Sequence, residues 1–260
     1  MLEGPIPQKK YTRTFQSHLM ELLEELNHIH NEVQSNPKRV DQVTRQRFWR
    51  LVGHIKRQPA PDKASLRKAT EIRDLLYEAR LGKARSLQWL TIWFLAGTFG
   101  LLYYLWLVLF DLQYTGNFWI DMLSVYFFPG ATVAAIVFCY YPFGRLLAGS
   151  ALGIRLDGIT RDIYYLPTLK INYYTYLTAS PPRRQWFFFI AGYWTAFTAL
   201  WVGTIGFILG GEWVGIAFGL ILGALETLGA IIGGKWGGEL GHFHRERRIV
   251  QDWKRNLHKS

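Results

Sequence analysis

Four long stretches of this chain carry almost no charged side chain, and they constrain the fold more than any other feature. Residues 86–110, 122–144 and 185–211 contain no Asp, Glu, Lys or Arg, and residues 213–234 contain only Glu226. A helix needs about 20 apolar residues to cross a bilayer. The sequence therefore predicts a mainly α-helical membrane protein with four spans, at about residues 87–110, 122–144, 185–210 and 213–236.

The positive charge lies on one side of these predicted spans. All 30 Lys and Arg residues fall in residues 1–85, 145–184 and 235–260. Because cytoplasmic loops are enriched in Lys and Arg, both termini and residues 145–184 are predicted to face the cytoplasm of a plasma (inner) membrane. The net charge of +11 indicates anionic membrane lipids as partners. Nucleic acid is not expected as a partner, because no compact basic and aromatic module stands alone.

Residues 1–85 are predicted to form a cytoplasmic helical domain. Apolar residues follow one another in steps of four and three, as in a short heptad seam: Phe15, Leu19, Leu22, Leu26, Ile29 and Val33. Two further helices are expected over residues 40–56 and 65–81, with breaks at Asn36-Pro37 and at residues 58–62. The seam either packs within a small bundle or forms a coiled-coil contact with a partner or a second copy.

The membrane domain is assigned to residues 86–241, and residues 242–260 are interpreted as a basic cytoplasmic tail. Within the domain, residues 153–180 are predicted to form a small β-hairpin at the cytoplasmic face, between the second and third spans. Leu169, Ile171, Tyr173 and Thr175 alternate in a stretch rich in Tyr, Ile and Thr, which favours strand over helix.

The order of these parts resembles the site-2 protease family of intramembrane zinc metalloproteases. In that family an H-E-x-x-H helix precedes an A-R-x-L-G-I-type run, a strand, an S-P motif and a helix beginning A-G-P. Here residues 147–156 (Leu-Ala-Gly-Ser-Ala-Leu-Gly-Ile-Arg-Leu) are similar to that run, and Ser180-Pro181-Pro182 and Ala191-Gly192 stand where the later landmarks belong. The resemblance covers roughly residues 122–245 and implies a shared membrane core.

The metal motif of that family is degenerate in this chain. The register places Tyr141 and Arg145 at the two His positions and Pro142 at the Glu position, and only Gly144 keeps its type. Zinc needs imidazole or thiolate ligands and a neighbouring carboxylate base, whereas arginine is a fixed cation. The resemblance therefore implies a pseudoprotease with no catalytic residue, no metal and no cofactor at this turn. The nearest carboxylates for the third ligand position are Glu226 and Glu239.

A second group of metal-ligating residue types lies near the C-terminus. His242, His244 and Glu246 stand close together in the sequence, but basic residues flank them. We interpret them as the basic end of a helix near lipid headgroups rather than as a metal site.

The last predicted span carries glycines at every fourth position, in the pattern of a glycine zipper. They form two runs, Gly215, Gly219 and Gly223, then Gly229, Gly233, Gly237 and Gly241. Small residues at this spacing let helices approach closely in lipid. The stripe packs either against the preceding span or against another membrane protein or a second copy.

Two acidic residues of this region are candidate site residues. Glu226 is an ionisable group within hydrocarbon, which marks either a functional site or a carboxyl bonded between helices. Glu239 lies at the depth of Arg145 if the last span returns to the cytoplasm, whereas Glu226 lies roughly 20 Å deeper. A guanidinium near the membrane boundary favours a carboxylate partner. We therefore predict an Arg145–Glu239 ion pair, with a snorkelling Arg145 as the alternative.

The function predicted from these features is that of a non-catalytic membrane scaffold, regulatory or accessory subunit. It would bind another membrane protein, or itself, through the glycine-rich span or the N-terminal helices. Two alternatives remain open: a divergent intramembrane metallopeptidase, and an ion or proton transport component that uses Glu226.

Overall fold

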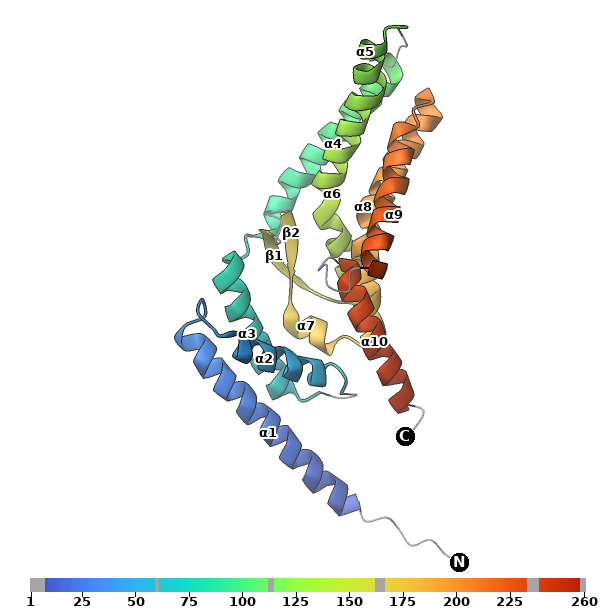
Figure 1. The fold of residues 1–260 in the computed structure, drawn as a ribbon. Coiled ribbons are helices and arrows are strands. Elements are labelled where there is room, and N and C mark those ends of the chain that lie inside the picture. Colours follow the sequence, from blue (N-terminus) through green and yellow to red (C-terminus); the bar gives the residue numbers. More distant parts are fainter. Residues whose placement is uncertain (1–7, 59–60, 112–114, 162–166, 233–238, 258–260) are drawn as a thin grey trace, which may run out of the picture. The chain divides into compact units, whose positions relative to one another are not determined.

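The structure, a computed structural model, describes residues 8–58, 61–111, 115–161, 167–232 and 239–257 (Figure 1). These residues are mostly helical, with one two-stranded antiparallel sheet. The chain divides into two compact units. Unit 1 comprises Met1–Lys83, Tyr173–Thr178 and Asp252–Ser260, and unit 2 comprises Ala84–Asn172 and Ala179–Gln251.

Unit 1 contains three helices near the N-terminus, α1 (Gln8–Ser35), α2 (Gln42–Ile55) and α3 (Lys63–Leu81). Aspartates cap two of them. The Asp41 carboxylate accepts from the Thr44 amide at 2.6 Å, and Asp62 accepts from the Ser65 amide at 2.9 Å. Each cap satisfies a backbone donor that the first helical turn leaves unpaired. The helices thus begin within two residues of the predicted starts at 40 and 65.

The predicted heptad seam is used for packing inside unit 1. Leu26, Ile29 and Val33 are fully buried, and α1 packs chiefly along α3, which contributes Leu66, Ala69 and Ile72 to the same interior. Thr44 Oγ1 donates to Glu32 Oε1 at 2.7 Å and joins α2 to α1. The described part of the seam is therefore occupied by the chain's own helices, in the arrangement of a small bundle.

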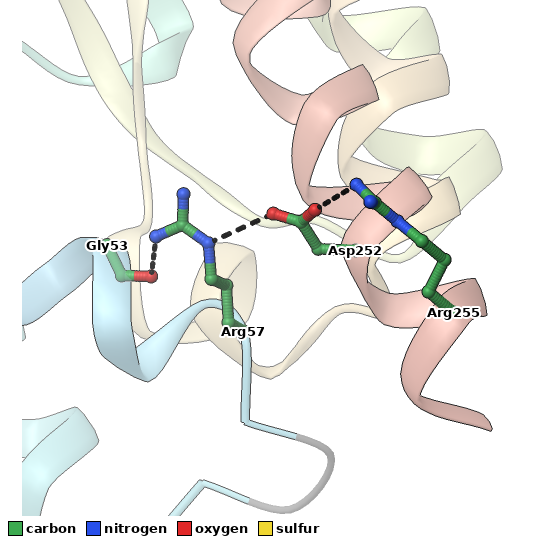
Figure 2. A network of polar contacts seen from close by, with 4 residues as sticks. All are labelled: Gly53, Arg57, Asp252 and Arg255. Atoms are coloured by element: carbon green, nitrogen blue, oxygen red, sulfur yellow. Dashed lines mark hydrogen bonds and ion pairs between the residues drawn. The ribbon is translucent and has the colours of Figure 1, made fainter. Parts of the chain in front are cut away.

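A polar network in unit 1 joins the end of α2 to the end of α10 (Glu239–Leu257). Arg57 Nε donates to Asp252 Oδ2 at 3.4 Å, and Arg57 Nη1 donates to the Gly53 carbonyl at 2.9 Å (Figure 2). Arg255 Nη2 donates to the other Asp252 oxygen at 2.7 Å. Because these side chains are substantially exposed, the network orients the two helix ends more than it stabilises them.

The strand prediction was wrong for the last part of the hairpin segment. Residues 173–178 form a short helix, α7 (Tyr173–Thr178), in unit 1. Tyr173, Tyr176 and Leu177 are all buried, and their i, i+3, i+4 spacing gives one apolar helical face. The Tyr173 and Tyr176 rings stack with centroids 5.5 Å apart. The alternation that continued through Thr175 was therefore coincidental beyond Ile171.

Three helices of unit 2 are long and apolar enough to cross a membrane, which makes this a membrane protein. Leu87–Phe110 consists of η1 (Leu87–Trp89), α4 (Leu90–Trp106) and the start of η2 (Leu107–Asp111). Phe118–Leu152 consists of α5 (Phe118–Asp121), η3 (Met122–Phe127) and α6 (Phe128–Leu152), and the third helix is α8 (Pro181–Gly210). The fourth predicted span corresponds to α9 (Val214–Ile232), whose apolar part within the described residues, Val214–Leu228, is shorter. The fourth span stays a prediction.

These helices pack in the order α4, α6, α8, α9, each alongside the next (Figure 1). Their shared interior is formed by the buried side chains of Tyr104, Val108, Val133, Ile136, Val137, Ala199 and Val202. Large apolar side chains also point outward: Phe99 is 69% exposed, Ile208 73% and Ile231 72%. In water so much outward apolar surface would be costly, whereas lipid accommodates it.

The predicted sheet is present between α6 and α8. It pairs β1 (Leu156–Arg161) with β2 (Pro167–Ile171), and Ile159 lies opposite Leu169. Arg85, just before the first span, extends the pairing, because its amide donates to the Ile159 carbonyl at 2.7 Å and its carbonyl accepts from the Ile159 amide at 2.9 Å. All five residues of β2 are buried.

Two predicted boundaries differ from the structure. The second span was expected to end at Gly144, but α6 continues to Leu152 and ends at Gly153, which adopts a left-handed conformation with φ 73°. Residues 242–260 were interpreted as a tail, but α10 continues to Leu257 and buries Leu240, Ile249 and Val250. The charged residues Arg145 and Glu246 in these extensions are paired with Glu239 and Arg184, respectively.

Candidate functional site

The degenerate motif lies within α6, facing α8. Pro142 and Gly144 are both buried. A Cβ atom at Gly144 would lie 2.6 Å from Trp194 Cβ, so the glycine is required for α8 to approach this closely. The Trp194 indole donates to the Tyr140 carbonyl at 2.8 Å. Two of the four residues that the register aligned with a metal motif, Pro142 and Gly144, are thus buried in a helix that packs against its neighbour.

Arg145 and Glu239 are in direct contact. Arg145 Nε donates to Glu239 Oε1 at 2.6 Å, and Arg145 Nη1 donates to the Leu169 carbonyl at 2.6 Å. The side chains are 19% and 8% exposed, respectively. A single guanidinium therefore joins α6, β2 and α10, and its geometry is that of a structural ion pair rather than of a side chain extended to the headgroups.

A second arginine–glutamate pair, which the sequence analysis did not predict, lies on the next span. Arg184 Nε donates to Glu246 Oε2 at 3.0 Å, and each side chain is only 2% exposed. Arg184 Nη1 also donates to the Ala179 carbonyl at 3.2 Å. The pair binds the first turn of α8 to the middle of α10. A buried guanidinium is tolerated here because its charge is matched and its donors are used.

The spacing of the two glutamates explains how α10 meets both arginines. Glu246 follows Glu239 by two helical turns, so the two carboxylates lie on one face of α10, about 10 Å apart along its axis. The same region is packed by stacking of Phe188 on His242, with ring centroids 4.8 Å apart. A Cβ atom at Gly192 would lie 2.7 Å from Leu240. We refer to Arg145, Arg184, Glu239 and Glu246 together as the arginine–glutamate clamp.

The alternative metal group near the C-terminus does not assemble in the structure. Glu246 is engaged by Arg184, and His242 Nδ1 lies 3.0 Å from Arg245 Nη2. Within the described residues, no group of three or more His, Cys, Asp or Glu side chains is placed so that it could hold a metal ion.

A third polar junction, which was also missed, lies at the opposite ends of the spans. Tyr104 is fully buried and donates its hydroxyl hydrogen to Glu212, which is itself buried. Glu212 also accepts from the amides of Val214 and Gly215 at the start of α9. A carboxylate at a helix N-terminus satisfies unpaired amides and complements the helix dipole. The acid just before the apolar helix α9 was the available sequence signal, but its tyrosine partner was not predictable from position.

Glu226 lies between α8 and α9. Its Oε1 accepts from the Thr195 hydroxyl, and among the described residues its buried Oε2 has no hydrogen-bond partner. The hydroxyls of Tyr193 and of Thr227, the residue after Glu226, lie 3.0 Å apart. Glu226 is therefore bonded between helices, as one of the two interpretations expected, and retains one unsatisfied oxygen.

The first glycine run faces α8 within the chain. A Cβ atom at Gly215 would lie 2.6 Å from the Gly203 Cα, one at Gly219 would lie 2.7 Å from the Leu200 amide, and Gly223 faces Ala196. Gly219 and Gly223 also line an open groove of about 560 Å³ between α8 and α9. Gly241 is buried in α10, nothing of the surroundings of Gly229 is described, and Gly233 and Gly237 lie outside the described residues. The described stripe thus serves packing within the monomer.

Comparisons with known proteins identify no relative: no family model, no curated protein and no solved structure matches this chain. The resemblance to the site-2 protease family therefore rests on the order of residues and segments alone.

We predict that Arg145 and Glu239 are energetically coupled. In a double-mutant cycle, Arg145→Ala and Glu239→Ala should each destabilise the protein in detergent, and the double variant should lose less than the sum by about 1–3 kcal/mol, because each single change leaves a largely buried charge unpaired. Thermal and denaturant unfolding measure the three variants. Strictly additive losses would show that the contact contributes no coupling.

We also predict that Arg184 is required for stability and its neighbour Arg183 is not. Arg184→Ala strands the buried Glu246 carboxylate and should lower the free energy of unfolding by about 3–5 kcal/mol. Arg183→Ala removes the same charge from an exposed position and should change it by less than about 0.5 kcal/mol.

The paired replacement Arg184→Met with Glu246→Leu provides the control. It removes both charges and keeps apolar volume, so it should recover much of the stability that Arg184→Ala loses. Equal effects of Arg183→Ala and Arg184→Ala would contradict the assignment of the buried pair.

Proposed function

We propose that this chain is a non-catalytic scaffold, regulatory or accessory subunit of a membrane complex, built on a site-2-protease-like core whose metal ligands have been replaced. In this proposal the protein is multi-pass in a plasma membrane, with four spans and both termini in the cytoplasm. The one-sided distribution of Lys and Arg supports the orientation.

One observation carries the proposal, namely the engagement of Arg145. It occupies the position that the resemblance assigns to the second zinc-ligating histidine, and its guanidinium donates to Glu239 and to the Leu169 carbonyl. Guanidinium remains protonated in proteins and cannot act as a metal ligand. In this proposal, the ion pair between α6 and α10 replaces the bridge that a shared ion would have made between two helices.

The proposal favours binding over catalysis for a second reason. Two buried carboxylates of unit 2 serve structural contacts: Glu246 binds Arg184, and Glu212 binds Tyr104 and the start of α9. These groups bind one another tightly, which stabilises the helices and leaves their outward surfaces as the parts that can contact a partner.

The orientation is tested by cysteine accessibility. Ser180, which precedes α8 and is exposed, is changed to Cys in a Cys139→Ala background. A membrane-impermeant maleimide should label Ser180→Cys only after the cells are opened, because residues 145–184 face the cytoplasm. A Trp119→Cys variant, whose side chain is 75% exposed in the predicted outer connection, should be labelled on intact cells. The reverse pattern would overturn the topology.

The function is tested on the intact protein, purified from its native membranes in mild detergent. We expect a defined membrane protein, or a second copy, in fixed ratio to the chain, and a zinc content that does not change when Arg145 is replaced by Ala. Stoichiometric zinc that is lost on substitution within residues 141–145, together with peptidase activity, would instead support the metallopeptidase and overturn the proposal.

A transport component is the second candidate, favoured by the unsatisfied oxygen of Glu226 between α8 and α9. The isosteric change Glu226→Gln keeps the shape and the Thr195 hydrogen bond but removes the titratable group. Proton or cation flux into proteoliposomes that is present in the wild type and lost in this variant would select transport. Equal flux in both would exclude a role for Glu226 in conduction.

A further inference from the structure

The outward face of α2 has a composition that neither the packing of unit 1 nor the proposed function explains. Thr44, Phe48, Val52 and Ile55 face the interior of the unit. On the opposite side, two large apolar residues remain exposed, Val43 at 62% and Trp49 at 50%. Both lie on a helix whose first turn is capped by the Asp41 side chain.

Cations surround these apolar residues. Arg45 and Arg50 are exposed on α2, and Lys38 and Arg39 are exposed in the turn just before it. Within the described part of the chain, none of these four side chains makes a hydrogen bond or an ion pair, whereas the side chain of Arg47 on the same helix binds Glu25 at 3.1 Å. The helix itself contains no Asp or Glu. We call Val43, Trp49 and these four cations the α2 face.

The α2 face consists of two stripes on the helix. At 100° per residue, Val43 and Arg50 lie on one stripe, and Arg45 and Trp49 lie on the other. Trp49 points about 120° away from Val43 around the helix, and the exposed side chain of Gln46 lies between the two stripes. Two apolar side chains and two cations thus share one half of the surface of one helix. This arrangement is typical of helices that lie in the interface of an anionic bilayer, with tryptophan at the headgroup level.

We propose that the α2 face docks on the anionic lipid surface of the membrane that the chain itself crosses. Charge complementarity supports lipid as the occupant, because each Lys or Arg near an anionic leaflet contributes about 1 kcal/mol, or about a factor of five in the docked population. The apolar helices of unit 2 supply the second argument, since they hold unit 1 at a membrane and the docking step is intramolecular. The α2 face has only one tryptophan and one valine to insert. So small an apolar surface suits the membrane–water interface better than a groove on a protein.

The test uses the full chain in nanodiscs, with a fluorophore on Gln46→Cys in the Cys139→Ala background. Gln46 is exposed between Val43 and Trp49. In nanodiscs of phosphatidylcholine with about one quarter phosphatidylserine, a spin-labelled lipid should quench the probe, and quenching should fall as salt rises. Pure phosphatidylcholine should give little quenching. The same probe on Met20→Cys, which is exposed on α1 at 61%, serves as the matched control and should remain unquenched in both.

Charge variants then assign the effect to the face. Arg45→Gln with Arg50→Gln should lower the ratio of docked to undocked protein at least about tenfold, whereas Arg45→Lys with Arg50→Lys should retain it. Trp49→Ala should weaken docking in both salt conditions. Circular dichroism of each variant checks that α2 remains helical.

Two outcomes would overturn the proposal. One is a fluorophore that stays unquenched in anionic nanodiscs. This outcome would also contradict the proposal if added RNA or an acidic protein changed the fluorescence instead, because the α2 face would then bind a soluble partner. The other is equal quenching in neutral and anionic nanodiscs, which would remove the electrostatic basis. Because both leaflets of the nanodisc are anionic, the result does not depend on the proposed topology or on the scaffold function.

Discussion

The burial of Arg184 against Glu246 is the interaction on which the arrangement of α10 depends. Both side chains are 2% exposed, so neither charge can be solvated if the other is withdrawn. The second pair, Arg145 with Glu239, acts two helical turns away on the same face of α10 and also binds the β2 backbone through Leu169. Two pairs at this spacing determine both the axial position and the rotation of α10, which a single pair would leave free.

The spans depend on a different constraint, which is close backbone approach in an apolar environment. Lipid provides no hydrophobic drive for helices to associate, so packing and internal hydrogen bonds must hold them together. The lack of a side chain allows Trp194 to approach Gly144, Gly203 to approach Gly215, and the Leu200 backbone to approach Gly219. The buried Tyr104–Glu212 bond joins α4 to the start of α9 at the end of the same interface. Small residues and a few satisfied polar groups therefore do what bulky apolar side chains do in a soluble core.

Unit 1 is organised by the rules of a water-soluble bundle. Its interior is aliphatic and aromatic, its helices begin at aspartate caps, and its ion pairs are mostly exposed. The α2 face departs from this pattern, because a soluble bundle gains nothing from an exposed tryptophan among unpaired cations. Because the α2 face exposes an apolar side chain and cations that do not stabilise the bundle, we expect this surface to contact a larger partner.

The sequence by itself determined the features that depend on local composition and periodicity. Stretches with few charges located the apolar helices, Asn36-Pro37 separated α1 from α2, and the seam of α1 contained the buried residues Leu22, Leu26, Ile29 and Val33. Matching depth on two helices also suggested that Arg145 and Glu239 meet, which is how the structure places them. Tertiary structure alone decided the contacts between distant residues: Arg184 and Glu246 are separated by 62 positions, and Tyr104 and Glu212 by 108. It also decided that residues 173–178 are helical and that α10 is a packed helix, because in both cases the residues that bury the segment lie elsewhere in the chain.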